Sequence, residues 1–156
     1  LGTTNTITGN GAAGPENGGI EVRVGGTATI RDAIIADNTG AAIQAFDAAI
    51  VDLRGSSSAT VPATGQTAGA IVRRGSFLSV REGASIVSAT HDGIEAGELA
   101  EVAIRDANTI VGNGANSYGI ACFYTTPMTA PAVALVGYLA NVSGTLGSSA
   151  NCNAFP

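Results

Sequence analysis

The 156-residue sequence contains no lysine, no tryptophan, only one histidine and only two cysteines. All seven cationic residues are arginines, and the formal net charge is −5. Because a nucleic-acid site requires clustered positive charge, this acidic composition argues against a nucleic-acid partner. The scarcity of His and Cys argues against a zinc site. No apolar run is long enough for a membrane span, and no signal-peptide pattern is present.

Helical patterning is also missing. No window of a dozen residues shows a sustained apolar stripe with a 3.6-residue period, so we expect very little helix. Instead, the chain contains short runs of four to six residues rich in Val, Ile and Thr that alternate between apolar and polar positions. Gly and Asn are abundant between these runs, where a turn with positive φ suits them.

Two motifs recur along the chain at intervals of about 25 residues. The first is an apolar centre, followed in four copies by Arg, and the second is an Ile preceded by Gly or Ala. The centres of the first motif are Ile30, Leu53, Val80, Ile104 and Leu135. The Ile residues of the second motif are Ile20, Ile43, Ile71, Ile94 and Ile120. A period of this size indicates stacked structural repeats.

A third motif, NTITGNG at residues 5–11, returns almost unchanged as NTIVGNG at residues 108–114. Each period therefore holds three short strands, which stack on the next coil at a spacing of about 4.8 Å. The sequence predicts an all-β fold, a right-handed parallel β-helix (solenoid) of about five to six three-stranded coils. We expect one domain over residues 1–156, with regular coils over about 5–137 and an irregular C-terminal tail over 138–156.

The Gly93-Ile94-Glu95 and Gly119-Ile120 segments, together with residues 108–114, resemble the right-handed parallel β-helix of the pectin-lyase-like superfamily. That superfamily includes pectate and pectin lyases, polygalacturonases, alginate epimerases and phage tailspikes. The resemblance implies the fold and, as one alternative, a polysaccharide-binding or polysaccharide-degrading function of the lyase or epimerase type. The sequence matches no branch's catalytic signature.

Cys122 lies in the last regular coil, and Cys152 lies 30 residues further on. This placement predicts a disulfide that ties the tail to the final coil. A disulfide would favour an oxidising compartment, and so a secreted or cell-surface protein. The alternative is a pair of unbonded cysteines that act as small apolar residues.

The arginines that follow the first motif form a candidate glycan-binding face: Arg31, Arg54, Arg81 and Arg105. We expect one on the outer surface of each coil, where a guanidinium fork can pair with a carboxylate or sulfate of an acidic polysaccharide. Two other interpretations stay open. The column can be a solvated face balanced by nearby acids, in which each ion pair contributes little, or a subunit contact.

The candidates for catalysis are few. A lyase or epimerase needs a base and a group that neutralises a carboxylate. His91 and Asp92 at a turn form one candidate pair, and Glu82 and Asp106 on neighbouring coils form another. Asp32 and Asp106 are separated by two coils and cannot act on one glycosidic bond. We expect no metal and no cofactor, because a calcium site at the turns would have too few oxygen donors.

The chain begins within the third strand of a coil, so we expect strand edges that pair with preceding coils or with another subunit. The segment is therefore predicted to be the C-terminal part or the processed product of a longer chain. The predicted function is an extracellular or cell-surface, non-catalytic structural or interaction module that can assemble end to end. The polysaccharide function named above is the alternative, and enzymatic activity is left open.

Overall fold

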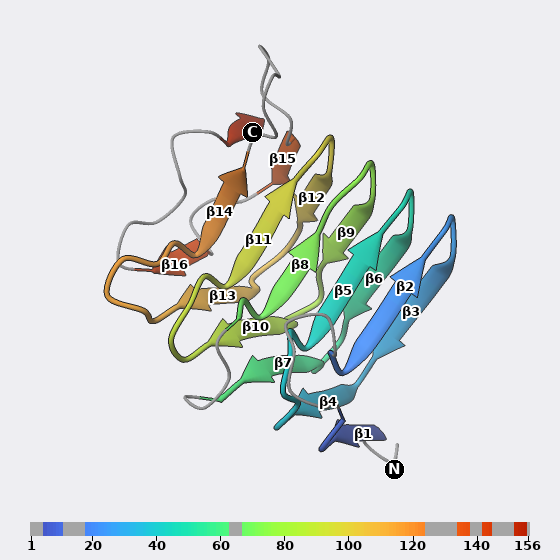
Figure 1. The fold of residues 1–156 in the computed structure, drawn as a ribbon, viewed down its shortest axis with the longest axis vertical. Coiled ribbons are helices and arrows are strands. Elements are labelled where there is room, and N and C mark those ends of the chain that lie inside the picture. The colour runs from blue at the N-terminus through green and yellow to red at the C-terminus, as the bar shows by residue number, and fades with distance from the viewer. Residues whose placement is uncertain are drawn as a thin grey trace.

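The computed structural model describes residues 5–10, 18–62, 67–123, 134–137, 142–144 and 152–155, and these residues contain no helix. Their strands form three parallel sheets stacked as a β-solenoid of about four turns. The predicted fold class is confirmed, although the number of turns is slightly lower than the five to six expected. Figure 1 shows successive coils stacked from the blue N-terminal strands to the red C-terminal ones.

Each coil contributes one strand to each sheet, in the order sheet B, sheet C, sheet A. Sheet A contains β1 (Asn5–Thr8), β4 (Ala33–Ala36), β7 (Ser58–Val61), β10 (Ser85–Ser88), β13 (Thr109–Gly112) and β16 (Val142–Gly144). Sheet B contains β2 (Ile20–Arg23), β5 (Ile43–Phe46), β8 (Ala70–Val72), β11 (Ile94–Gly97) and β14 (Ile120–Phe123). Sheet C contains β3 (Thr27–Arg31), β6 (Ile50–Arg54), β9 (Phe77–Val80), β12 (Glu101–Ile104), β15 (Ala134–Gly137) and β17 (Asn153–Phe155). Within the predicted tail, β16 and β17 extend sheets A and C.

The alternating apolar residues of the three sheets meet inside the coil and form one continuous core. Its largest fully buried aliphatic side chains include Ile35, Ile43, Leu53, Leu78, Ile86, Ile94, Ile104, Ile110 and Ile120. Burying a side chain of this size contributes about 1.5–3 kcal/mol. Valines and alanines fill most of the remaining interior positions.

The first sequence motif stacks in register over four coils. Ile30 pairs with Leu53, Leu53 with Val80, and Val80 with Ile104. The fifth predicted member is wrong: Leu135 pairs with Val102 rather than with Ile104. The shift is two residues, which is one full period of a strand.

The second motif holds in sheet B except at its third copy. Ala70, not Ile71, pairs with both Ile43 and Ile94. A one-residue shift moves a side chain to the other face of a strand, so Ile71 points outward. There it belongs to a small apolar cluster with Phe46 and two alanines. The position predicted for Ile71 was therefore wrong.

The corners between sheets depend on residues with positive φ. Between sheets B and C, two such residues follow one another in each coil: Val24-Gly25, Asp47-Ala48, Arg74-Gly75 and Glu98-Leu99. Between sheets C and A, the residue after each arginine of the column has positive φ: Asp32, Gly55, Glu82 and Asp106. Positive φ at the joints was expected of Gly and Asn, yet most of these positions hold other residues. The ladder continues through the corners, where Ala48 N donates to Arg74 O at 2.9 Å.

Buried polar side chains tie the corner between sheets C and A to the preceding coil. Asn108 Nδ2 donates to Val80 O at 3.1 Å, and Asn108 Oδ1 accepts from Gly83 N at 3.1 Å. Ser57 Oγ donates to Arg54 O at 2.7 Å and accepts from Ala33 N at 3.3 Å. These side chains satisfy backbone groups that the corner would otherwise leave unpaired.

Candidate functional site

The four column arginines lie on the outer surface at the end of sheet C, one per coil. Arg31 pairs with Arg54 across β3 and β6. Arg81 N donates to Leu53 O at 3.0 Å, and Arg105 N donates to Val80 O at 2.9 Å, so the other two follow the same ladder. The column arrangement expected from the sequence is present on four successive coils.

Acidic neighbours engage three of these four guanidinium groups. Arg81 donates from Nε and Nη2 to the two carboxylate oxygens of Asp52, at 2.9 and 2.5 Å. Arg54 Nε lies 3.6 Å from Asp52 Oδ2, and Arg31 Nη1 lies 3.3 Å from Glu82 Oε2. The hydrogen bonds from Arg81 lower the pKa of Asp52. Among the described residues, Arg105 alone of the four makes no salt bridge.

Glu82 and Asp106 come together, but through the backbone. Asp106 Oδ2 accepts a hydrogen bond from Glu82 N at 3.3 Å, while the Glu82 carboxylate faces Arg31. Asp32 acts in a similar way at the same corner of the first coil, where its Oδ1 accepts a hydrogen bond from Ser56 N of the next coil at 2.9 Å. These contacts give the corner acids a structural role in joining coils.

His91 and Asp92 lie in the connection from sheet A to sheet B, beside a hollow of about 320 Å³. Its lining residues are Thr90, His91, Asp92, Ala115, Asn116 and Ser117. His91 Nδ1 lies 3.0 Å from Thr90 Oγ1, and Asp92 Oδ1 accepts from Tyr118 N at 2.6 Å. One carboxylate oxygen of Asp92 is therefore engaged in holding the neighbouring coil.

A second arginine cluster, on the outer face of sheet B, was missed by the sequence analysis. Arg23, Arg73 and Arg74 surround Phe46 and line, with Glu98, a hollow of about 150 Å³. The ring centroid of Phe46 lies 5.0 Å from the guanidinium carbon of Arg23 and 5.0 Å from that of Arg74. A signal was available, because Arg23 and Phe46 each stand three residues after the start of a sheet B strand.

Glu95 is a largely buried acid of this face, and its pKa is shifted. Its side chain is 18% exposed and lies between the cluster and the His91 turn, with Oε2 3.2 Å from Arg73 Nη2. Burial raises the pKa of Glu95, and the nearby Asp92 carboxylate adds to this, whereas Arg73 opposes it. Perturbed acids are enriched at functional sites, although structural ion pairs also produce them.

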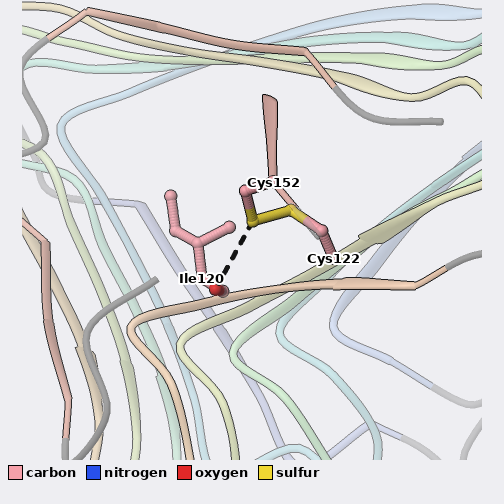
Figure 2. Close-up of a disulfide and its surroundings, with 3 residues drawn as sticks. All are labelled: Ile120, Cys122 and Cys152. Atoms are coloured by element: carbon pink, nitrogen blue, oxygen red, sulfur yellow. Dashed lines mark hydrogen bonds between the residues drawn. A yellow bond between two sulfur atoms is a disulfide. The ribbon is translucent and has the colours of Figure 1, made fainter. Parts of the chain in front are cut away.

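The predicted disulfide between Cys122 and Cys152 is present, with Cα atoms 5.2 Å apart. Cys122 lies in β14 and is part of the core, and Cys152 packs against the same core. Figure 2 shows the bond beside Ile120, whose carbonyl oxygen lies 3.8 Å from Cys152 Sγ. A disulfide sulfur carries no hydrogen, so this is a packing contact that covers the last described strand of sheet B.

No three His, Cys, Asp or Glu side chains of the described residues lie close enough together to hold a metal ion. Within the same residues, no helix is long and apolar enough to cross a membrane. Comparison with known proteins gives no significant match to any family model, curated protein or solved structure.

Proposed function

We propose that this chain is a secreted or cell-surface β-solenoid that acts as a non-catalytic structural or interaction module and associates end to end. The disulfide supports the location, because such bonds persist in oxidising compartments. The stack itself supports the role, since parallel coils present strand edges that another set of coils can extend.

The observation that carries this proposal is the partial exposure of core residues at the end of the stack formed by β1, β2 and β3. These three strands are the terminal members of their sheets. Ile7, Ile20 and Val22 point into the core but are only partly buried. One coil further, Ile35 and Ile43, the partners of Ile7 and Ile20, are 0% exposed. A second set of coils placed on this end would bury the exposed apolar surface and pair the edge strands.

The charged column supports the same function. Asp52 joins Arg54 of its own strand to Arg81 of the next coil, and Arg31 reaches Glu82 two coils away. These contacts run along the axis of the stack and so hold coils to one another. They leave few free charges on this face for a substrate.

Analytical ultracentrifugation and electron microscopy of the purified chain test the proposal. We expect concentration-dependent oligomers or filaments that disappear in Val22→Lys, which places a charge at the open end. Arg81→Ala, on the side of the stack, is the matched control and should still associate. Circular dichroism verifies that both variants are folded. A protein that stays monomeric at all concentrations contradicts end-to-end association.

Acidic polysaccharide binding or cleavage is the second candidate, and one specific observation favours it. Arg105 remains without a salt bridge among the described residues, and Glu95, with its raised pKa, lies near His91 and Asp92. The resemblance of the repeats to the pectin-lyase-like superfamily agrees with this candidate, but a shared fold alone is a weak argument for a function. Retention on immobilised polygalacturonate or alginate, lost in Arg81→Ala and Arg105→Ala, would support it. Equal retention of the variants would reject the column as the binding face.

A further inference from the structure

The hollow on the outer face of sheet B is built from three successive coils. Arg23 ends β2, Phe46 ends β5, and Arg73 and Arg74 follow β8. These four residues, with Glu98 of the next coil, line about 150 Å³. Since a water molecule occupies about 30 Å³ in the liquid, the space suits a small ion with a few waters.

The guanidinium groups of this cluster keep donors that no described residue uses. Arg74 contacts Asp47 through Nε at 2.9 Å, and Arg23 contacts Glu21 through Nε as well. Arg73 contacts Glu95 through Nη2. The Nη groups of Arg23 and Arg74 therefore have no acceptor among the described residues. In the column on sheet C, by contrast, Arg81 places both Nε and Nη2 on one carboxylate.

Phe46 fixes the positions of these donors. Its side chain belongs to a buried apolar cluster, and the residue is only 8% exposed. The guanidinium groups of Arg23, from the preceding coil, and Arg74, from the following coil, each lie 5.0 Å from its ring centroid. Stacking of guanidinium on an aromatic ring is favourable and restricts the long side chains. The side chains of Arg23 and Arg74 are 42% and 49% exposed, so a solute can reach them.

We propose that this hollow binds a tetrahedral oxyanion, sulfate or phosphate, either as the free ion or as a monoester. The lining itself holds three arginines and one acid, Glu98, so positively charged donors outnumber acids on the surface that an anion meets. Arginine forks suit sulfate and phosphate oxygens. A tetrahedral group can accept from donors in three directions, whereas a planar carboxylate presents its lone pairs in one plane.

The acids behind the arginines set the strength of this site. Glu21 and Asp47 pair with Arg23 and Arg74 through Nε, away from the Nη groups assigned to the ligand, whereas Glu95 contacts Nη2 of Arg73. Exposed ion pairs of this kind are weak and do not need to break when an anion arrives. They do reduce the local positive potential, so we expect millimolar rather than micromolar dissociation constants for the free ions.

Isothermal titration of the full chain with sodium sulfate and sodium phosphate, at ionic strength held constant with sodium chloride, tests the site. We expect saturable binding that weakens about tenfold in Arg23→Gln and in Arg74→Gln, because each loses one charged fork. Arg31→Gln removes an exposed arginine on sheet C that is already paired with Glu82, and it should leave binding unchanged. Absence of saturation, or an equal loss in Arg31→Gln, overturns the proposal.

Further measurements test the role of the ring, the shape of the ligand and its source. Phe46→Leu retains all three arginine charges but removes the aromatic ring. It should weaken binding, because the ring positions the guanidinium donors. Unchanged binding contradicts this role of the ring. Glucuronate should bind more weakly than sulfate, and equal binding overturns the tetrahedral assignment. Glucose 6-sulfate and glucose 6-phosphate identify the source: tighter binding than the inorganic ion assigns the site to an esterified group, and equal binding to the free ion. Thermal unfolding verifies that each variant is folded.

Discussion

Arg81 holds both carboxylate oxygens of Asp52 across neighbouring strands of sheet C, with Nε 2.9 Å from Oδ1 and Nη2 2.5 Å from Oδ2. Arg54 approaches the same carboxylate from Asp52's own strand. The pair explains why a column of like charges can be stacked at strand spacing. On three of the four coils, those of Arg31, Arg54 and Arg81, an acid of the same face neutralises part of this positive charge.

Replacing Asp52 with Asn should lower stability in a pH-dependent way. The pKa of Asp52 in the folded chain lies below its ordinary value of 3.8, so its contribution is present above pH 3.8 and is lost as pH falls through the folded pKa. We expect Asp52→Asn to cost less than about 1 kcal/mol at neutral pH, because the pair is partly solvated. Urea unfolding at neutral and strongly acidic pH checks this. A cost that does not shrink in acid would contradict the assignment.

Glu95→Gln should have the opposite pH dependence. Because the pKa of Glu95 is raised in the folded chain, folding is favoured while the carboxyl is protonated, and this contribution is lost as pH rises from 4.5 through the folded pKa. The amide variant should therefore gain stability relative to the parent as pH increases over that window. Parallel urea titrations of both proteins between acid and neutral pH measure the difference, and a constant difference would exclude Glu95 as the titrating group.

Leu99→Gly should stabilise the solenoid. Leu99 has φ of 66° and is 66% exposed, so it bears the strain of the left-handed conformation and contributes little packing. A left-handed conformation costs a residue with a Cβ atom about 1–2 kcal/mol. Gly avoids this cost but loses more backbone entropy on folding, which offsets about 0.5–1 kcal/mol of the gain. We expect a net gain of up to about 1 kcal/mol in the free energy of unfolding. Leu99→Ala keeps the Cβ atom and should show little change in the same measurement.

Asn108→Ala should destabilise the corner between sheets C and A. Asn108 is 5% exposed, and its removal leaves Gly83 N and the buried Val80 O without these side-chain contacts. Loss of buried partners of this kind costs about 1–3 kcal/mol. Asn113→Ala is the control, because Asn113 is exposed and donates one side-chain hydrogen bond, to Ser88 O at 3.2 Å. Equal losses for the two variants in chemical unfolding would count against a special role for the corner.

Reduction of the disulfide should lower stability substantially. Cys122 and Cys152 are separated by 30 residues, and closing a loop of this size in the unfolded chain is worth about 3–4 kcal/mol in the chain-entropy description. Chemical unfolding with and without reductant measures the loss. The double variant Cys122→Ala/Cys152→Ala should resemble the reduced protein and should not respond to reductant. A response in that variant would show that reductant acts elsewhere.

The period of the sequence predicts the fold because each coil repeats the same burial pattern. In Val51-Asp52-Leu53-Arg54 and in Leu78-Ser79-Val80-Arg81, apolar residues alternate with polar ones, and this alternation assigns the inward faces. The outward position of Ile71 could also have been predicted from the sequence. From sheet B to sheet C, the buried positions are eight residues apart, as from Ile94 to Val102, whereas Ile71 to Leu78 is seven. An odd change in spacing reverses the face.

The candidate sites were harder to predict, because a column is visible in sequence only when its members share a residue type. The arginines of sheet C do, so they were found. The cluster on sheet B contains different residue types, Arg23, Phe46 and Arg73. Their proximity becomes apparent only when the pairing of the sheet B strands is known. The acidic partners are also set by side-chain reach across coils, as between Arg31 and Glu82, which spacing does not encode.

Variation in coil length is unevenly distributed, and this has a consequence for how the protein can change. The step from sheet B to sheet C is eight residues from Ile20 to Ala28 and from Ile94 to Val102, but it is fifteen from Ile120 to Leu135. The connection from sheet A to sheet B varies as well, from Ile34 to Ile43 in one coil and from Ser58 to Ala70 in another. The solenoid therefore accepts insertions at more than one edge. The edge between sheets A and B carries the His91 hollow, and its varying length indicates that new peptide segments can be grafted there without disturbing the stack.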